Sequence, residues 1–218
     1  MNSSHNIPEH GLYLDFCSHD AATYAIRHWY YRSEMPVGKL VRIGCWEDGS
    51  FIGVVLFGMS ASNALMSPYG LQQTEGCELS RVAFREHTAP MTRIIKIALL
   101  LLHRHDPGLR LVVSFADPTV HLGKIYQAGG WIYTGRTAPD HQYRDHTGKI
   151  WHSRDVSSTG YKNIFNKIKK VPKTSECEKI SIPGKHRYIY SFDPSLRLEL
   201  QRLAKPYPKN MEFKNEFE

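Results

Sequence analysis

The sequence predicts an α/β protein with a mixed, partly antiparallel sheet flanked by helices, followed by a basic C-terminal extension. Two β-rich runs at 41–46 and 51–58 are joined through Asp48-Gly49, a dipeptide typical of tight hairpins. A long apolar helix pattern at 91–102 separates an extended run from a second β-rich run. Lys and Arg accumulate after residue 135. The hairpin, the helix that connects the two extended runs and the basic tail together predict this fold class.

The stretch 78–135 alternates strand, helix, strand, short helix and strand. Thr88 followed by Pro90 predicts the start of the long helix, because neither position needs a backbone donor inside the helix. The β-rich run at 109–116 ends at Asp117-Pro118, and ligands bind at such strand ends in open α/β sheets. Asp117 is therefore a candidate catalytic residue. The alternative is that it only caps the next helix.

The distribution of charge predicts two parts of the chain. Residues 1–135 contain 11 Lys and Arg and 11 Asp and Glu, whereas residues 136–218 contain 17 and 10. The net charge is +7. We expect a core at 1–135 and a basic, aromatic-rich extension at 136–218 that packs on the core and contacts DNA, since Lys and Arg displace counterions from phosphates. A solvated basic tail is the alternative.

The segment before the first hairpin carries a cluster of ring side chains. Residues 1–14 are expected to form a polar leader, and Asp20 is expected to cap a helix that leads to His28-Trp29-Tyr30-Tyr31. One helical face cannot bury four consecutive rings, so some of them are expected to face a cleft. From the residues alone, His28 is expected to be a satisfied histidine at a helix C-terminus.

A second recognition segment lies near the end of the chain, at Lys185-His186-Arg187-Tyr188. Basic groups hold phosphates while rings stack on bases, so these four residues are predicted to bind the substrate. The alternative is that the rings cover the sheet edge while the cations stay solvated.

Cysteine spacing and apolar run lengths restrict the class of protein further. The four cysteines form no CxxC pair, which indicates reduced thiols of a cytoplasm rather than a zinc ribbon. The longest apolar run, 97–102, is too short to cross a bilayer. No membrane partner is therefore expected.

Four motifs in order resemble the Mom family of bacteriophage DNA modification proteins, on a scaffold similar to Gcn5-related N-acetyltransferases. They are Glu78-Leu79-Ser80-Arg81, Val113-Ser114-Phe115-Ala116-Asp117-Pro118, His121-Leu122-Gly123 and Ile125-Tyr126-Gln127-Ala128. The resemblance covers about 25–190. It implies an enzyme of the bacterial host cytoplasm that converts adenine in phage DNA to N6-carbamoylmethyladenine and so protects the DNA from restriction.

The resemblance also implies roles for individual residues. Asp117 would be the base, aided by His28 or His121, and Tyr126 would protonate the leaving group. Arg81 would orient the donor, with Ser114 and Glu78 shaping the pocket. Trp29 or Tyr30 would stack on the flipped adenine. Alternatively His28, Asp117, His121 and Tyr126 could form an iron or other metal site.

The group donor remains unknown. Acetyltransferases of this fold hold the pyrophosphate of coenzyme A with a Gly-rich loop that opens the long helix. The corresponding segment 85–92 contains no Gly, so acetyl-CoA is doubtful as the donor. Two alternatives stay open: an acetyl-CoA-dependent acyltransferase acting on a protein, a tRNA or a small amine, and a noncatalytic DNA-binding protein on the same scaffold.

Overall fold

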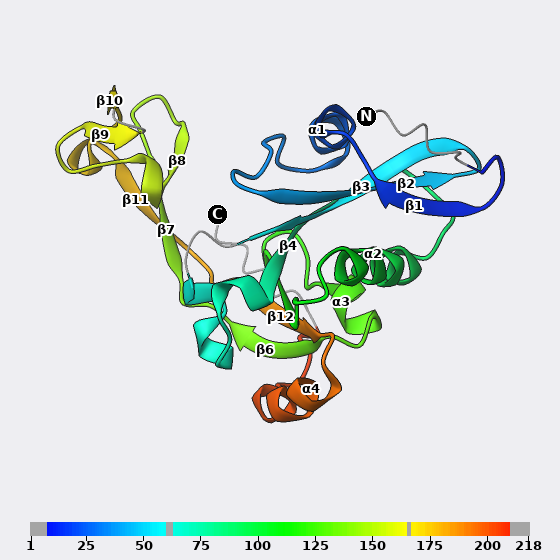
Figure 1. Ribbon diagram of the computed structural model, residues 1–218. Coiled ribbons are helices and arrows are strands. Elements are labelled where there is room, and N and C mark those ends of the chain that lie inside the picture. Colours follow the sequence, from blue (N-terminus) through cyan, green and yellow to red (C-terminus); the bar gives the residue numbers. More distant parts are fainter. Residues whose placement is uncertain (1–7, 60–62, 165–166, 210–218) are drawn as a thin grey trace.

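A computed structural model describes residues 8–59, 63–164 and 167–209 (Figure 1). Its main sheet has seven strands in the order β1-β2-β3-β4-β5-β12-β6. Only β4 and β5 pair in parallel, and all other neighbours are antiparallel, so the predicted mixed sheet is confirmed. The bounds are β1 Leu12–Phe16, β2 Leu40–Glu47, β3 Ser50–Gly58, β4 Gly76–Phe84, β5 Leu111–Ala116, β6 Ile132–Arg136 and β12 His186–Ser191.

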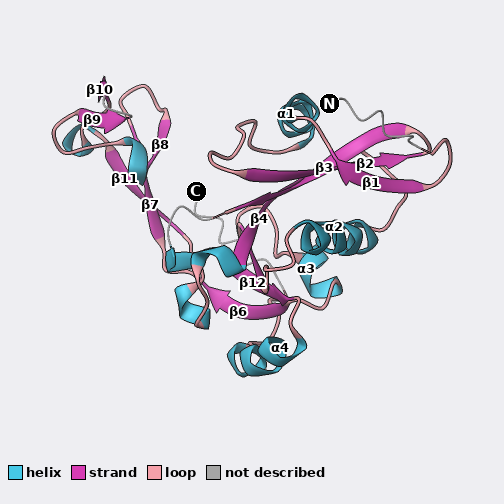
Figure 2. Cartoon of the chain, in the orientation of Figure 1, coloured by secondary structure: helices cyan, strands magenta, loops and turns pink. Residues whose placement is uncertain are grey.

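Helices cover both faces of this sheet (Figure 2). Side chains alternate along β3, so that Val54 and Leu56 pack under α1 whereas Val55 and Phe57 join the core under α2. The third group of buried side chains lies between α4 and the β5, β6 and β12 strands. The helices are α1 His19–Trp29, α2 Met91–His105, α3 Lys124–Ala128 and α4 Pro194–Leu200. Across the described residues, no helix is long and apolar enough to cross a membrane.

Local signals account for the hairpin and, through Ser18, for the start of α1, but not for the start of α2. Asp48 and Gly49 have φ angles of 49° and 73°, as a type I′ turn requires. Residue Ser18, rather than Asp20, caps α1 by accepting a hydrogen bond from the Ala21 amide. The long helix starts later than predicted, with Pro90 at its N-cap position and no side-chain cap.

Glu47 explains why Thr88 does not cap α2. The backbone N–H groups of Thr88 and Ala89 and the Thr88 hydroxyl all donate to the Glu47 carboxylate, at 2.8–2.9 Å. Thr88 is therefore fixed to the end of the β2–β3 hairpin, 41 residues earlier in the chain. A contact that distant leaves no local pattern in the sequence.

The main sheet uses two segments that the sequence analysis assigned elsewhere. Strand β1 pairs with β2, although 1–14 was expected to be a polar leader; residues 1–7 lie outside the described part of the chain. Strand β12 lies between β5 and β6, so the sheet includes a strand from the expected extension at 136–218. His186 and Tyr188 are buried in it because their rings pack in the core, where Nδ1 of His186 and the Tyr188 hydroxyl find partners.

Residues 140–182 form a separate unit, which we call the arm, inserted between β6 and β12. Figure 1 shows the arm projecting from the core. It contains a three-stranded sheet in the order β11-β7-β8 and a hairpin of β9 and β10. The bounds are β7 Asp140–Arg144, β8 Ile150–His152, β9 Tyr161–Ile164, β10 Lys167–Lys170 and β11 Glu178–Ile182.

The root of the arm is a tight crossing of two chain segments. The Thr137 amide donates to the Lys185 carbonyl at 2.9 Å, and the Lys185 amide donates to the Thr137 hydroxyl at 3.0 Å. A Cβ atom at Gly184 would lie 1.9 Å from the Thr137 carbonyl oxygen, so only glycine fits at this crossing. The arm is thereby fixed beside the ends of β5 and β6.

Candidate active site

The site begins where two parallel strands part. Strands β4 and β5 pair only from Gly76 with Leu111 to Leu79 with Ser114. Beyond that point β4 stays paired with β3 as far as Phe84, while β5 stays paired with β12 as far as Ala116. A cavity of about 1160 Å³ opens in the resulting gap. Such a gap at the carboxyl end of a parallel strand is where α/β sheets bind ligands.

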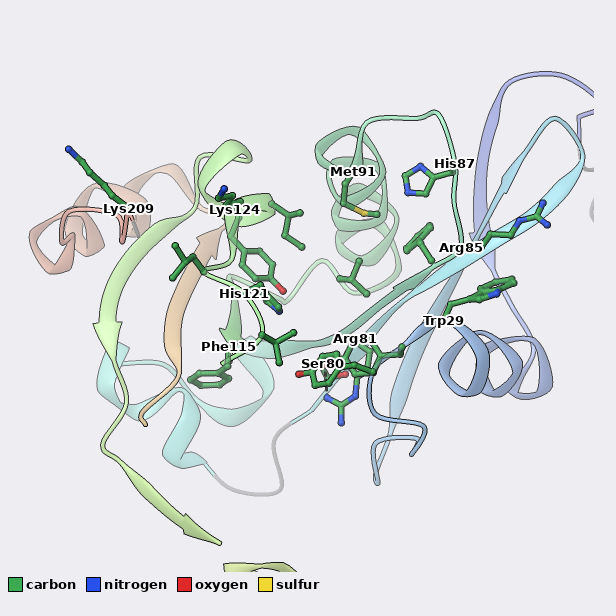
Figure 3. A pocket seen from close by; sticks show the side chains of 18 residues that line it. Trp29, Ser80, Arg81, Arg85, His87, Met91, Phe115, His121, Lys124 and Lys209 are labelled. Carbon is green, nitrogen blue, oxygen red and sulfur yellow. Dashed lines mark hydrogen bonds between the residues drawn. The ribbon is translucent and has the colours of Figure 1, made fainter. Parts of the chain in front are cut away.

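This first cavity is lined from both faces of the sheet. Figure 3 shows Phe115, His121 and Lys124 along one side, with Trp29 and Arg85 along the other. The residues after α1 enter from the face that α1 covers, whereas the α2 and α3 residues Met91, Ile125 and Tyr126 enter from the opposite face. Two different molecules can therefore approach the same gap from opposite sides.

Aromatic side chains form the wall on the α1 side. Trp29, Tyr30 and Tyr31 all line the first cavity, and the rings of Tyr30 and Tyr31 lie 4.4 Å apart between centroids. Trp29 is also anchored by packing on Phe51. The rings suit a flat, apolar group such as a nucleobase.

Arg81 is one of the cations that line this cavity, together with Arg85 and Lys124. Its Nη1 atom donates to the Ser80 carbonyl at 2.7 Å, and its guanidinium lies 5.2 Å from the centroid of the Tyr30 ring. Its Nε atom is buried and has no hydrogen-bond partner among the described residues. A buried donor without a partner costs free energy, so Arg81 is prepared to bind an acceptor on a ligand.

Tyr126 and Ser114 form a buried polar pair on the α3 side. Their hydroxyl oxygens lie 2.8 Å apart, and Ser114 also lies 2.9 Å from the Leu79 carbonyl, which joins it to β4. Burial raises the pKa of Tyr126 to about 12, so the phenol is protonated at neutral pH. Ser114 lines neither cavity and acts by holding the Tyr126 hydroxyl in place.

His121 reaches the same cavity as a hydrogen-bond donor. Its Nδ1 atom accepts a hydrogen bond from the Gly123 amide at 3.1 Å, so the neutral ring carries its proton on Nε2. Burial lowers the pKa of His121, although the Asp117 carboxylate opposes that effect. A neutral imidazole with a free Nε2–H can donate to a substrate, but it has no free nitrogen with which to accept a proton.

A second cavity of about 780 Å³ lies between the core and the arm. It shares Phe115 with the first cavity. The core contributes Arg32, Glu78, Asp117 and Lys185, and the arm contributes Asp140, Gln142, His152, Ser153 and Arg154. Charged groups of both signs therefore surround this cavity, in contrast to the aromatic first cavity.

Asp117 is the most strongly held group of the second cavity. Its Oδ1 atom accepts hydrogen bonds from the Thr119 hydroxyl at 2.6 Å and the Thr119 amide at 3.1 Å, and its Oδ2 lies 3.2 Å from Nη2 of Arg32. Burial alone would raise the pKa of Asp117, but these hydrogen bonds and the charges of Arg32 and Lys185 hold that pKa below its usual value. The side chain is an ionised carboxylate at neutral pH. It stabilises the turn at 118–120 rather than capping α3.

Glu78 and Lys185 face the same cavity, and their side-chain pKa values are shifted in opposite directions. Burial raises the pKa of Glu78, although Lys185 and Arg81 lower it in part. Burial likewise lowers the pKa of Lys185, and the nearby Arg32 lowers it further, while Asp117 and Glu78 oppose the change. The pKa of each of these groups depends on the charges of the others, so the charged groups of the second cavity titrate as a coupled set.

The structure separates the predicted site residues into three groups. Trp29, Tyr30, Arg81, His121 and Tyr126 line the first cavity. Glu78, Asp117 and Lys185 line the second. The remaining predicted residues, His28, Ser114, His186, Arg187 and Tyr188, line neither of these two cavities.

Three of those remaining residues have structural partners instead. His28 is exposed on α1, where its Nδ1 lies 2.8 Å from the Tyr24 carbonyl. His186 is buried against the Tyr133 hydroxyl, and Tyr188 donates to the Leu122 carbonyl. The alternation of side chains along a strand explains the burial of these two rings, because positions 186 and 188 share one face of β12.

Arg187 points to the other face of β12. Its Nε atom donates to the Thr134 hydroxyl on β6 at 2.8 Å. It therefore links two neighbouring strands of the core sheet. Of the four residues predicted from the segment 185–188, only Lys185 reaches one of the two cavities.

The four candidate metal ligands do not form a metal site. Within the described part of the chain, no group of three or more His, Cys, Asp and Glu residues is placed to hold a metal ion. His28 is on the exposed surface of α1, and Nδ1 of His121 is occupied by the Gly123 amide. These residues do not fit an iron centre.

Sequence reasoning missed several residues that the structure places in the cavities. Arg32 and Tyr31 belong to the ring-rich segment after α1, yet neither was singled out. Phe115 directly precedes the strand end at 116, Thr119 and Lys124 follow it, and all three also line the cavities. Their positions beside Asp117 and before Ile125 were the available signal.

The fold and the two cavities define a mixed α/β protein with a split sheet and a ligand-sized opening between β4 and β5. The chain belongs to the Mom protein family, whose model matches residues 11–209. No curated protein matches the chain.

Several solved structures of acetyltransferases are similar to the chain at low identity. The Bacillus subtilis acetyltransferase in complex with CoA has 12% identity and a TM-score of 0.43, over 84% of this chain and 99% of that one. The aminoglycoside acetyltransferase AAC(6')-Ib in complex with coenzyme A has 12% identity and a TM-score of 0.45, over 88% and 98%. The N-acetyltransferase from Staphylococcus aureus Mu50 has 7% identity and a TM-score of 0.43, over 83% and 97%.

Proposed function

We propose that this protein is a phage DNA modification enzyme that converts adenine in DNA to N6-carbamoylmethyladenine and so protects the DNA from host restriction. Membership of the Mom family carries the proposal, because the resemblance to that family implies this reaction. The substrate is duplex DNA, so the enzyme acts in the cytoplasm of the bacterial host and needs no membrane partner.

The aromatic wall supports adenine as the acceptor. The exocyclic amine lies inside the duplex, so the nucleotide must be flipped out before it can react. Trp29, Tyr30 and Tyr31 provide stacking surfaces on the α1 side of the gap, the side on which the arm root and Asp117 also lie. The donor then approaches from the α2 and α3 side, where Tyr126 lies.

The chemistry requires one proton to leave the amine and one to reach the leaving group. A bond forms between N6 and the methylene carbon of the transferred group, while the bond from that carbon to the leaving group breaks. Asp117 is ionised and takes the proton from N6. Tyr126 is protonated and gives its proton to the leaving group. Arg81 and the Nε2–H of His121 stabilise the negative charge that develops.

The donor is a small molecule or a carrier-bound group that fits the first cavity. The Glu47 carboxylate occupies backbone donors at the opening of α2, which a pyrophosphate would need free. This arrangement weighs against acetyl-CoA. An acetyl-CoA-dependent acyltransferase remains the second candidate because the similar solved structures are acetyltransferases. Titration with coenzyme A tests it, since saturable binding at micromolar concentration would favour that candidate.

Mass spectrometry of nucleosides tests the proposed reaction directly. DNA from bacteria that express the wild-type protein should contain deoxyadenosine with the added mass of a carbamoylmethyl group. The Asp117→Ala variant should give no such product, whereas Asp20→Ala, which changes an exposed carboxylate on α1, should give the wild-type amount.

Three outcomes of this experiment count against the scheme. Full modification by folded Asp117→Ala would remove Asp117 as the base. A different added mass would show that the transferred group is not carbamoylmethyl. DNA binding without any product would favour the noncatalytic DNA-binding alternative.

A further inference from the structure

We propose that one face of the β9–β10 hairpin binds the phosphate backbone of the DNA duplex beyond the modified base. This inference rests on the proposed function, because DNA is its substrate, and it identifies where the duplex is held. In the antiparallel register of the hairpin, Lys169 lies opposite Lys162 and Lys167 lies opposite Ile164. Directly opposed residues point to the same face, so Lys162, Lys167 and Lys169 share what we call the lysine face.

The charges of this hairpin have no acidic counterparts nearby in sequence. The segment 156–175 contains five Lys and no Asp or Glu. Lys173 pairs with Glu176 at 3.5 Å, whereas none of the three lysines of the lysine face has an ion-pair partner among the described residues. Like charges directly opposite each other destabilise a β-ribbon. The lysine face therefore keeps an uncompensated charge that a polyanion would neutralise.

The opposite face of the hairpin has a different character. Tyr161 and Ile168 lie on it, with 55% and 79% of their surface exposed, together with Asn163 and Lys170. A two-stranded ribbon with three cations on one face, and exposed apolar groups beside a single lysine on the other, fits the edge of a DNA groove, because the major groove admits a β-ribbon.

The arm sets the distance between the hairpin and the reacting base. Strands β7 and β11 contain five residues each and run from the arm root toward the hairpin (Figure 1). Five residues of strand span about 17 Å, which corresponds to about five base pairs at 3.4 Å each. Arg154 and His152 line the second cavity nearer to the root. The duplex would thus contact the lysine face about half a helical turn from the flipped adenine.

The inference predicts a loss of binding with unchanged chemistry. In the variant K162Q/K167Q/K169Q, the slope of log K against log salt for a DNA duplex should decrease by up to about 2.7, from about 0.9 for each phosphate contact. The affinity at low salt should fall at least about tenfold. The rate of modification at saturating DNA should remain that of the wild type, since no altered residue lines either of the cavities at the site.

A matched control variant tests whether the position of the removed charges, rather than their number, determines the loss of DNA binding. K96Q/R104Q/R202Q removes three exposed cations from α2 and the turn after α4, which Figure 1 shows away from the arm. This control should keep the wild-type salt slope. Fluorescence anisotropy with a labelled duplex measures all three proteins, and circular dichroism verifies that each is folded.

Two results would overturn the inference: equal salt slopes for the hairpin variant and the wild type, or binding of the hairpin to anionic lipid vesicles but not to the duplex. Its failure is distinct from failure of the proposed function. A hairpin variant with normal DNA binding and normal product would reject the lysine face alone. Wild-type protein that binds DNA through the lysine face but gives no modified nucleoside would reject the proposed reaction alone.

Discussion

Arg32 and Asp117 form an ion pair at 3.2 Å between the segment after α1 and the loop after β5, 85 residues apart in the sequence. Both residues line the second cavity, between the core and the arm. The pair links the aromatic wall, which immediately precedes Arg32, to the carboxylate that we propose as the base. Substrate binding on the α1 side can therefore alter the position and charge environment of Asp117 through Arg32.

Arg32→Gln should weaken activity more than stability. The arginine side chain is 44% exposed, and ion pairs of that kind contribute at most about 1 kcal/mol, so the change in unfolding free energy should stay below that value. Asp117 keeps its two Thr119 hydrogen bonds but loses a neighbouring positive charge and its lateral support. The rate of modification should fall while the thermal midpoint barely changes. A large loss of thermal stability would show that the pair is structural.

Tyr126→Phe should separate catalysis from packing. Loss of the buried hydroxyl removes one hydrogen bond with Ser114 and should cost about 1 kcal/mol of stability. Loss of a general acid should reduce the rate about 10²-fold to 10⁴-fold. Tyr188→Phe is the control, because its hydroxyl is also buried and hydrogen-bonded but lines neither cavity. Equal rates for the two variants would remove Tyr126 from the mechanism.

Tyr31→Ala should weaken binding of the flipped base. A stacked base contributes about 1–3 kcal/mol, so the dissociation constant for target DNA should rise about 5-fold to 150-fold. Tyr31 is half exposed, and Tyr24 on the preceding helix α1 is exposed to the same degree but does not line the first cavity. Tyr24→Ala should bind DNA as the wild type does. Isothermal titration with a duplex that carries the target sequence measures both.

Acid should destabilise the protein below about pH 6.5 because of His186. Burial lowers the pKa of His186 from 6.5, so the unfolded state binds more protons than the folded state once the pH falls below that value. The contribution of His186 to stability is complete above pH 6.5 and is lost as the pH falls toward the folded-state pKa. His186→Gln should flatten this dependence in urea unfolding at a series of pH values. An unchanged slope would assign the effect to other groups.

Gly184→Ala should disturb the root of the arm. The added Cβ atom would meet the Thr137 carbonyl oxygen at 1.9 Å, and the backbone shift needed to relieve this overlap should cost about 1–3 kcal/mol. Gly108→Ala is the control, because its nearest neighbour would be a mobile carboxylate oxygen at 3.3 Å. Differential scanning calorimetry should show a lower midpoint for the first variant only. Equal midpoints would mean that the crossing is not tight.

The sequence predicted best those elements whose signals are local. The Asp48-Gly49 turn, the apolar α2 and the consecutive Leu111-Val112-Val113 each depend on neighbours in the chain, and each lies where it was expected apart from the later start of α2. The mixed sheet followed from their order. The match to the Mom family confirms the resemblance that came from four short motifs.

The parts that sequence reasoning missed depend on distant partners. Strand β12 looks like a basic recognition segment because it contains His186, Arg187 and Tyr188, yet the sheet absorbs these residues through Tyr133, Thr134 and Leu122. Glu47 fixes the start of α2 from another hairpin. Arg32 reaches Asp117 only after the sheet has formed. No local pattern encodes these contacts.

Strands β6 and β12 are antiparallel neighbours, and the chain leaves one at Thr137 and enters the other at Lys185 after completing the arm. The two ends are already hydrogen-bonded to each other, so a short turn could join them and the core sheet would still close. The arm is in this sense a detachable module carried on a hairpin. In chimaeras that exchange residues 138–184 between relatives, the DNA affinity should therefore follow the arm. The reaction should follow the core.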